Sequence, residues 1–358
     1  MGLENRAGDP HLVELNSGVD ALYASSRSPV PGDFFQSMLE RKIEAGEDEL
    51  GLFPVDISGV GFEVSSHSWG KYPISVKHEF GEMGFSQSEK LPAVRLQIRA
   101  KYLHAVGPED AIGWFSKILK GAGIRPAWTP SRLDLFADFQ GWDPVATDKE
   151  RIVRRASHLK MNEDRDKFTG FEFGRRKTGT INARIYNKTH ELLAKPNGWT
   201  RQQWGTLFIP DQPVWRFEYE FHTSVFREVG ITSVEQALSR AGELWALAND
   251  TWLTFRDLGE DSNKSRWPIS WEWIQIQNAT LRGTAVPIHR IRDIEKIMSL
   301  ERLIPTLHGY LTSIGAKRGA TDLASCFEVA YEVLRRAEEM GLISTIEKLA
   351  LKRRKFAL

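Results

Sequence analysis

Alternation of apolar and polar positions predicts strands through much of the first 225 residues. Residues 11–24 alternate over most of their length, which predicts one or two strands there. Further strands are predicted at residues 61–66, 94–103, 131–140, 170–176, 180–187 and 214–222. Apolar residues at helical spacing predict helices at residues 33–45, 107–120, 147–160 and 188–195. Mixed strands and helices of this kind are typical of an α+β domain.

The pattern changes after residue 223, where strand signals nearly vanish. Helical periodicity then runs through residues 233–249, 288–311 and 321–339. We therefore predict an α+β domain over residues 11–225 and an α-helical C-terminal domain over residues 226–358. Residues 1–10 have little apolar content, and we expect them to be flexible.

Composition narrows the class of protein. The chain has 358 residues, one cysteine and a formal net charge of +1. This charge balance excludes a polybasic protein that binds nucleic acid through bulk charge, so any such binding must come from local patches. A single cysteine excludes a disulfide framework and a zinc-ribbon site. Because no apolar run reaches the roughly 18 residues of a membrane span and the N-terminus lacks the apolar core of a signal peptide, we expect a cytoplasmic protein without a membrane partner.

Three predicted strands carry chemically capable residues on one face. A strand places every second side chain on the same face. By this period, one face holds Arg132, Asp134, Phe136 and Asp138 from the first strand, Asn182, Arg184, Tyr186 and Lys188 from the second, and Arg216, Glu218 and Glu220 from the third. The opposite faces are apolar, and we expect Tyr219 to lie in the core there.

A sheet face exposed to water is the plainer interpretation of these strands. Exposed faces, however, more often hold Thr, Ser, Lys and Gln than the Asp, Glu, Arg and Tyr found here. Facing carboxylates repel each other unless cations or a metal ion lie between them. Since hard divalent cations prefer oxygen ligands, we predict Mg²⁺ or Mn²⁺ bound by Asp134 or Asp138 together with Glu218 or Glu220.

Tyr186 is the candidate nucleophile on this face. A tyrosine hydroxyl has an ordinary pKa near 10 and needs a cation or metal ion nearby to react at neutral pH. Arg184, Lys188 and Arg216 would hold phosphate oxygens or stabilise charge in the transition state. Carboxylates, a metal ion, a tyrosine and basic residues are together what transesterification of a DNA phosphodiester requires. Tyr102 and Tyr72 are the other candidates in predicted strand regions.

The segment over residues 169–188 resembles a hairpin found in known proteins. It contains a Gly-Arg-Arg-Lys-Thr turn and an Arg-x-Tyr-Asn-Lys strand, with Glu191 shortly after it. The strand that holds Asp134 and Asp138 is similar to an acidic strand upstream of that hairpin, and Arg216-Phe217-Glu218 to an Arg-x-Glu strand downstream. On these motifs the chain resembles the replication initiation factor (Rep_trans) family, the rolling-circle initiators of plasmids and filamentous phages.

The resemblance implies a fold and an activity. The fold would be a central antiparallel sheet with flanking helices, a relative of the HUH endonucleases. The activity would be a nickase and ligase that cuts one origin strand and keeps the 5′ phosphate on a tyrosine. Its partners would be origin DNA, a host helicase and a second copy of the chain. Because no His-hydrophobic-His triplet is present, the carboxylates would have to supply most of the metal ligands.

Basic residues near the hairpin are the predicted DNA contacts. Arg175, Arg176 and Lys177 lie in the turn, and Arg132 lies on the acidic strand. His190 and His222 are further candidates for metal ligation, and His190 also for proton transfer.

Three alternative functions remain open on the sequence. A conjugative relaxase of an integrative element would use the same chemistry at a transfer origin. A DNA-binding replication regulator would bind without cleavage. A metal-dependent phosphodiesterase that uses water would cleave without forming a protein–DNA adduct.

Overall fold

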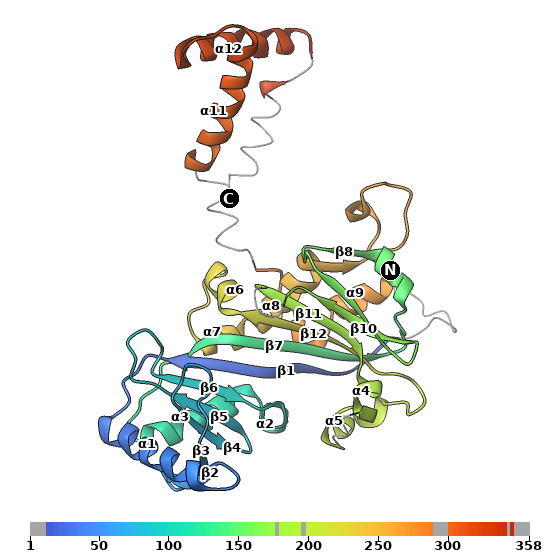
Figure 1. Cartoon of the computed structure of the whole chain (residues 1–358). Coiled ribbons are helices and arrows are strands. Elements are labelled where there is room, and N and C mark those ends of the chain that lie inside the picture. The colour runs from blue at the N-terminus through green and yellow to red at the C-terminus, as the bar shows by residue number, and fades with distance from the viewer. Residues whose placement is uncertain (1–11, 176–178, 195–197, 289–299, 342–343, 347–358) are drawn as a thin grey trace. The chain divides into compact units, whose positions relative to one another are not determined.

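The computed structural model describes residues 12–175, 179–194, 198–288, 300–341 and 344–346 (Figure 1). The strands are β1 (Val13–Ser26), β2 (Leu52–Ile57), β3 (Val60–Ser65), β4 (Ile74–His78), β5 (Gly81–Phe85), β6 (Val94–Ile98), β7 (Thr129–Gln140), β8 (Ile152–Arg154), β9 (Leu159–Asp164), β10 (Lys167–Phe173), β11 (Ile181–Asn187), β12 (Trp215–His222) and β13 (Leu253–Phe255).

Helices connect and cover these strands. The α-helices are α1 (Gly32–Glu47), α2 (Ala100–Val106), α3 (Pro108–Gly121), α4 (Lys188–Ala194), α5 (Gly198–Gln203), α6 (Thr223–Glu228), α7 (Val234–Ser239), α8 (Ala241–Ala246), α9 (Trp271–Gln277), α11 (Leu300–Lys317) and α12 (Leu323–Glu339). Short helices of other types are η1 (Ala146–Arg151), η2 (Gly205–Leu207), η3 (Leu247–Trp252), η4 (Lys264–Arg266) and η5 (Thr280–Arg282). No helix in the described part of the chain is long and apolar enough to cross a membrane.

One large antiparallel sheet organises the described residues. It is 11-stranded, in the order β2-β3-β4-β5-β6-β1-β7-β12-β11-β10-β9. Strand β1 is 14 residues long and pairs with β6 on one side and β7 on the other, so it joins the two halves of the sheet. This mixed architecture, a large antiparallel sheet with helices, agrees with the predicted fold class.

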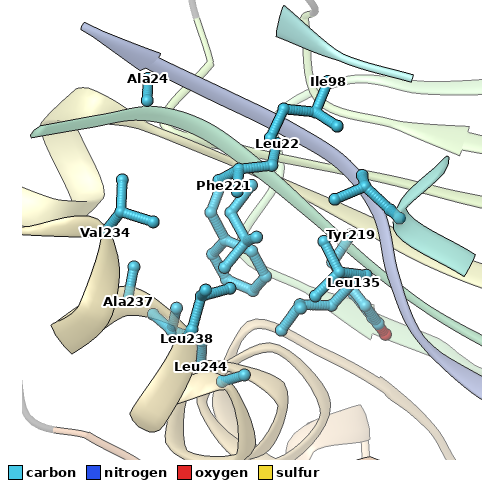
Figure 2. Close-up of a cluster of buried hydrophobic side chains, with 14 of the residues drawn as sticks. Leu22, Ala24, Ile98, Leu135, Tyr219, Phe221, Val234, Ala237, Leu238 and Leu244 are labelled. Atoms are coloured by element: carbon cyan, nitrogen blue, oxygen red, sulfur yellow. The ribbon is translucent and has the colours of Figure 1, made fainter. Parts of the chain in front are cut away.

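The apolar face of the sheet carries the core. Side chains of β1, β7 and β12 meet those of α7 and α8 (Figure 2), and the residues in contact include Leu22, Leu135, Phe221, Val234, Ala237, Leu238 and Leu244. Tyr219 lies on this face, as predicted, with 1% of its surface exposed, and its hydroxyl donates a hydrogen bond to Asn249 at 2.8 Å. This packing fixes the strands whose opposite face carries the candidate site.

The segment that follows β12 belongs to this core. It returns to the sheet: the Thr280 N–H donates to the Glu14 carboxylate on β1 at 2.7 Å, and the Leu281 N–H donates to the Ser17 hydroxyl at 3.3 Å. Contacts divide the chain into compact units Met1–His289 and Arg290–Leu358. This division differs from the predicted boundary at 225/226, because the helices after residue 225 cover the apolar face.

Two predicted elements differ from the structure. Residues 147–160 do not form one α-helix: the short 3₁₀ helix η1 ends at Arg151 and is followed by β8 and β9, because Ile152 and its neighbours pair with β13. Tertiary pairing here overrides the helical spacing of the segment. The predicted strand 94–103 ends at Ile98, and α2 begins at Ala100. Of the predicted helix 288–311, residues 289–299 lie outside the described residues.

Candidate functional site

Strand register brings the predicted site residues together in three rows on the polar face. The rows run across β7, β12 and β11 and are Asp138–Arg216–Tyr186, Phe136–Glu218–Arg184 and Asp134–Glu220–Asn182. The alternation predicted from the sequence is therefore present in all three strands. The carboxylates of the face are buried, however: Asp138 is 0% exposed and Glu218 is 2% exposed. Burial of so many charged groups requires that they be paired.

The first row is anchored by a buried ion pair. The Arg216 guanidinium donates from Nε to Asp138 Oδ1 at 2.6 Å and from Nη2 to Oδ2 at 2.8 Å. Its Nη1 donates to Asp20 on β1 at 2.9 Å, and the Trp204 indole N–H donates to Asp138 at 2.8 Å. Arg216 is only 1% exposed, and its contacts join β12 to β1 and β7.

The second row holds the tyrosine in place. The Tyr186 hydroxyl donates to Glu218 Oε2 at 3.1 Å, and Arg184 donates to the other oxygen of the same carboxylate. Arg184 and Lys188 lie over the Tyr186 ring, at 5.4 and 5.5 Å from its centroid. Burial of the hydroxyl and the adjacent Glu218 carboxylate raise the pKa of Tyr186 well above its ordinary value. The phenol is therefore neutral at physiological pH.

The third row is closed by Arg132. Its guanidinium donates to Asp134 at 2.7 and 2.5 Å and contacts Glu220 at 2.6 Å. Burial, with the neighbouring Glu218 and Glu220 carboxylates, raises the pKa of Asp134 to about 7, in spite of Arg132. Burial also opposes ionisation of Glu220, but His222 and Arg132 outweigh it and lower the pKa of Glu220.

The predicted metal ligands are engaged by cations. Asp134 and Glu220 contact Arg132, Asp138 pairs with Arg216, and Glu218 pairs with Arg184. Among the residues that the structure describes, no group of three or more His, Cys, Asp or Glu could hold a metal ion. In this arrangement each of the four carboxylates contacts an arginine, so a Mg²⁺ or Mn²⁺ ion would have to displace these ion pairs to bind here.

The other predicted residues lie at the margins of the face. Arg175 is exposed at the end of the hairpin, whereas Arg176 and Lys177 lie outside the described residues. Lys188 pairs with Glu191 at 2.5 Å, and His190 contacts Asp164 at 2.9 Å.

The alternative tyrosines lie away from the three rows. Tyr102 is on α2, not on a strand, and stacks on Phe80 with ring centroids 4.0 Å apart. Tyr72 is 6% exposed and lies beside β4, near Arg95. Of the three tyrosines predicted as candidate nucleophiles, Tyr186 is the one that lies in the three rows.

Three residues of the site were missed from the sequence. Asp20 contacts Arg216, and the His104 ring on α2 stacks on Phe136 with centroids 4.8 Å apart and contacts Asp20 at 3.1 Å. Burial opposes the ionisation of Asp20, but Arg216 and His104 outweigh it and hold the pKa of Asp20 below its usual range. Trp204, the third, follows α5 directly. The alternation along β1 puts Asp20 on the face opposite the apolar side chains. Only the pairing of β1 with β7 shows that this is the polar face that carries the three rows.

Comparison with solved structures gives a distant likeness. No family model matches the chain, and no curated protein matches it by sequence. Among solved structures, it is similar to a rolling circle replication initiator protein from Geobacillus stearothermophilus, with a TM-score of 0.45 and 13% sequence identity, over 78% of this chain and 100% of that chain.

Proposed function

We propose that the protein is a rolling-circle replication initiator that nicks and rejoins one DNA strand through Tyr186. The observation that carries the proposal is the hydrogen bond of 3.1 Å from the Tyr186 hydroxyl to Glu218, with Arg184 and Lys188 over the tyrosine ring. A hydroxyl, a proton acceptor and two cations are thus combined on one sheet face. The motif that resembles the Rep_trans family supports the choice of DNA as substrate.

The proposed step is a transesterification. The Tyr186 oxygen attacks the phosphorus of a phosphodiester, its proton passes to Glu218, and the 3′ oxygen of the upstream nucleotide leaves and takes up a proton from water. The product is a 5′-phosphotyrosine, and attack by the freed 3′ hydroxyl reverses the step. Arg184 and Lys188, which keep 31% and 10% of their side chains exposed, are placed to stabilise the charge on the phosphate.

The raised pKa of Tyr186 means that a nearby group must accept its proton during the reaction. Because the phenol is neutral before DNA binds, the proton has to move during the attack. Glu218 is the carboxylate in hydrogen-bond contact with the hydroxyl, so it is the proposed general base. A phosphate bound beside Arg184 would compete for that guanidinium and free Glu218 to accept the proton.

A denaturing gel tests the proposal. The protein is mixed with labelled single strands from the DNA around its own gene, with Mn²⁺ or with EDTA. A covalent band that is lost in Tyr186→Phe and kept in Tyr219→Phe is the expected result. A band that survives Tyr186→Phe contradicts the choice of nucleophile. Loss of the band in EDTA would show that a metal ion takes part, and this arm tests the cofactor prediction.

A DNA-binding regulator without cleavage is the second candidate. It is favoured by the arginines that engage every one of the four predicted metal ligands. It predicts binding to the same fragments, no covalent band under any metal condition, and unchanged binding in Tyr186→Phe.

A further inference from the structure

A basic pocket lies beside the candidate site and is used by no step above. Its cavity of about 620 Å³ is bounded by β1, β6, β7 and the start of α6. Four arginines and two tyrosines define what we name the arginine pocket: Arg27, Arg95, Arg132, Arg227, Tyr23 and Tyr72. The lining contains no Asp or Glu. Such a concentration of one charge in a chain of formal net charge +1 is the kind of local patch that binds an anion.

The charges of the pocket are largely uncompensated. Within the described residues, Arg27, Arg95 and Arg227 make no ion pair, whereas Arg132 is shared with Asp134 and Glu220. Arg27 and Arg227 are exposed. Guanidinium groups without a carboxylate partner, gathered around one cavity, are well suited to bind phosphate through bidentate hydrogen bonds.

Aromatic faces accompany the arginines. The Arg132 guanidinium lies 5.1 Å from the centroid of the Tyr23 ring, and the Arg95 guanidinium lies 4.0 Å from that of the Trp69 ring. Stacking holds the Arg95 guanidinium in place without engaging it in an ion pair, whereas Arg132 is already shared with Asp134 and Glu220. Cations that follow a phosphate backbone, combined with aromatic rings for bases, are the usual means of binding single-stranded nucleic acid.

The position of the pocket relates it to the tyrosine. Arg132 closes the third row of the site through Glu220, at 2.6 Å. His222, which lines the pocket, is six residues along β12 from Arg216, which is roughly 20 Å at the rise of a strand. One strand of DNA could therefore cover both places.

We propose that the arginine pocket binds the sugar-phosphate backbone of single-stranded DNA that flanks the cleaved bond. The inference rests on the proposed function for the identity of the strand, but its test needs no cleavage. Both sites lie within the unit Met1–His289.

Equilibrium binding tests the pocket in the full-length Tyr186→Phe protein, which removes the proposed chemistry. A fluorescent oligo-dT strand is titrated against this protein and against one that also carries Arg27→Gln, Arg95→Gln and Arg227→Gln. We expect binding to weaken about tenfold or more, and the slope of log affinity against log salt to fall by about 2, since each single-strand phosphate contact contributes about 0.7. The matched control carries Arg41→Gln, Arg155→Gln and Arg266→Gln, which remove the same charge outside the pocket.

Equal weakening by both triple variants would overturn the proposal, because bulk charge would then explain the binding. A larger loss for a duplex than for oligo-dT would also overturn it, in favour of a duplex contact.

If the pocket triple variant unfolds, ultraviolet cross-linking of 5-iododeoxyuridine strands to the unaltered protein tests the proposal instead. Cross-links to Tyr23, Tyr72 or Trp69 are expected, and cross-links confined to other residues contradict the pocket. Binding that is lost in the pocket triple variant, together with no covalent band from the unaltered protein in the gel assay, would support the arginine pocket and contradict the proposed nicking function.

Discussion

Arg216 shows how individual residues hold the polar face together. Its guanidinium contacts Asp138 and Asp20 on two different strands, and it packs on the Phe136 ring at 4.1 Å. The buried pair is not by itself a source of large stability, since desolvation offsets most of its attraction. Removing Asp138 is a different matter, because it leaves the buried Arg216 with Asp20 as its remaining carboxylate partner.

Replacement of Asp138 therefore has a large expected effect. In Asp138→Ala we expect the free energy of unfolding to fall by about 3 to 5 kcal/mol, because Arg216 keeps its charge in a buried position. Urea unfolding measures the change. Asp164→Ala, which removes an exposed carboxylate, serves as the control with an expected loss below about 1 kcal/mol. Equal losses in the two variants would show that the pair does not hold the face.

The raised pKa of Asp134 predicts a pH dependence of stability. Its pKa is about 7 in the folded chain against an ordinary value of 3.8. Between these values the folded state holds a proton that the unfolded state has lost, so stability falls as pH rises through this window. Relative to Asp134→Asn, the free energy of unfolding of the unaltered protein should fall by up to about 1.4 kcal/mol per pH unit. Urea titrations at several pH values measure this difference, and a flat difference contradicts the assignment.

At the scale of elements, the sequence predicts the strands that carry the site, but it does not predict which other elements pack against them. β7, β11 and β12 each keep a period of two over seven residues or more, so the phase of every side chain follows from the sequence. Asp20 and His104 sit in elements whose pattern carries no comparable motif, and the pairing of β1 with β7 spans more than a hundred residues. Which arginine pairs with which carboxylate also depends on the register between neighbouring strands. The sequence of a single strand does not give that register.

The close approach of β10 to the tyrosine gives a prediction at this scale. Gly170 has φ of +155°, and a Cβ there would lie 2.3 Å from the Ile185 carbonyl oxygen and 2.9 Å from Tyr186 Cα. In Gly170→Ala we expect a loss of about 1 to 3 kcal/mol and a weaker covalent band, because β11 must shift. Gly61→Ala is the control, since nothing lies within 4 Å of its Cβ. Unfolding curves and the gel assay measure both, and equal behaviour of the two variants would contradict the packing.

At the scale of the whole molecule, the extent of the hydrophobic core sets the boundary of the compact unit. The α+β class was predictable, because strand alternation is local. The division at 289/290 was not predictable. The helices after residue 225 have an ordinary amphipathic pattern, which does not indicate the surface against which they pack. The structure shows that they cover the same sheet.

Two truncations distinguish these divisions. The chain 1–289 keeps the contacts of Thr280 and Leu281 with β1, and we expect it to unfold cooperatively with a Tm within about 5 °C of the full chain. The chain 1–225 exposes Phe217, Tyr219 and Phe221, which are at most 1% exposed in the full chain, and we expect it to aggregate. Calorimetry and size-exclusion chromatography measure both. A soluble, cooperative 1–225 chain would support the boundary at 225/226.

The central place of β1 has a consequence for how the protein is made. During synthesis β1 emerges before either of its neighbours, and β7 is complete only 114 residues after Ser26, as the bounds of the two strands show. At about 5–20 residues per second, the edge of β1 that pairs with β7 stays open for roughly 6 to 23 s, and an open edge invites pairing with other chains. The polar residues along its length, Glu14, Asn16 and Asp20 among them, keep the nascent strand hydrated during that interval. Groups that later hold the site together would thus first protect the unfinished chain.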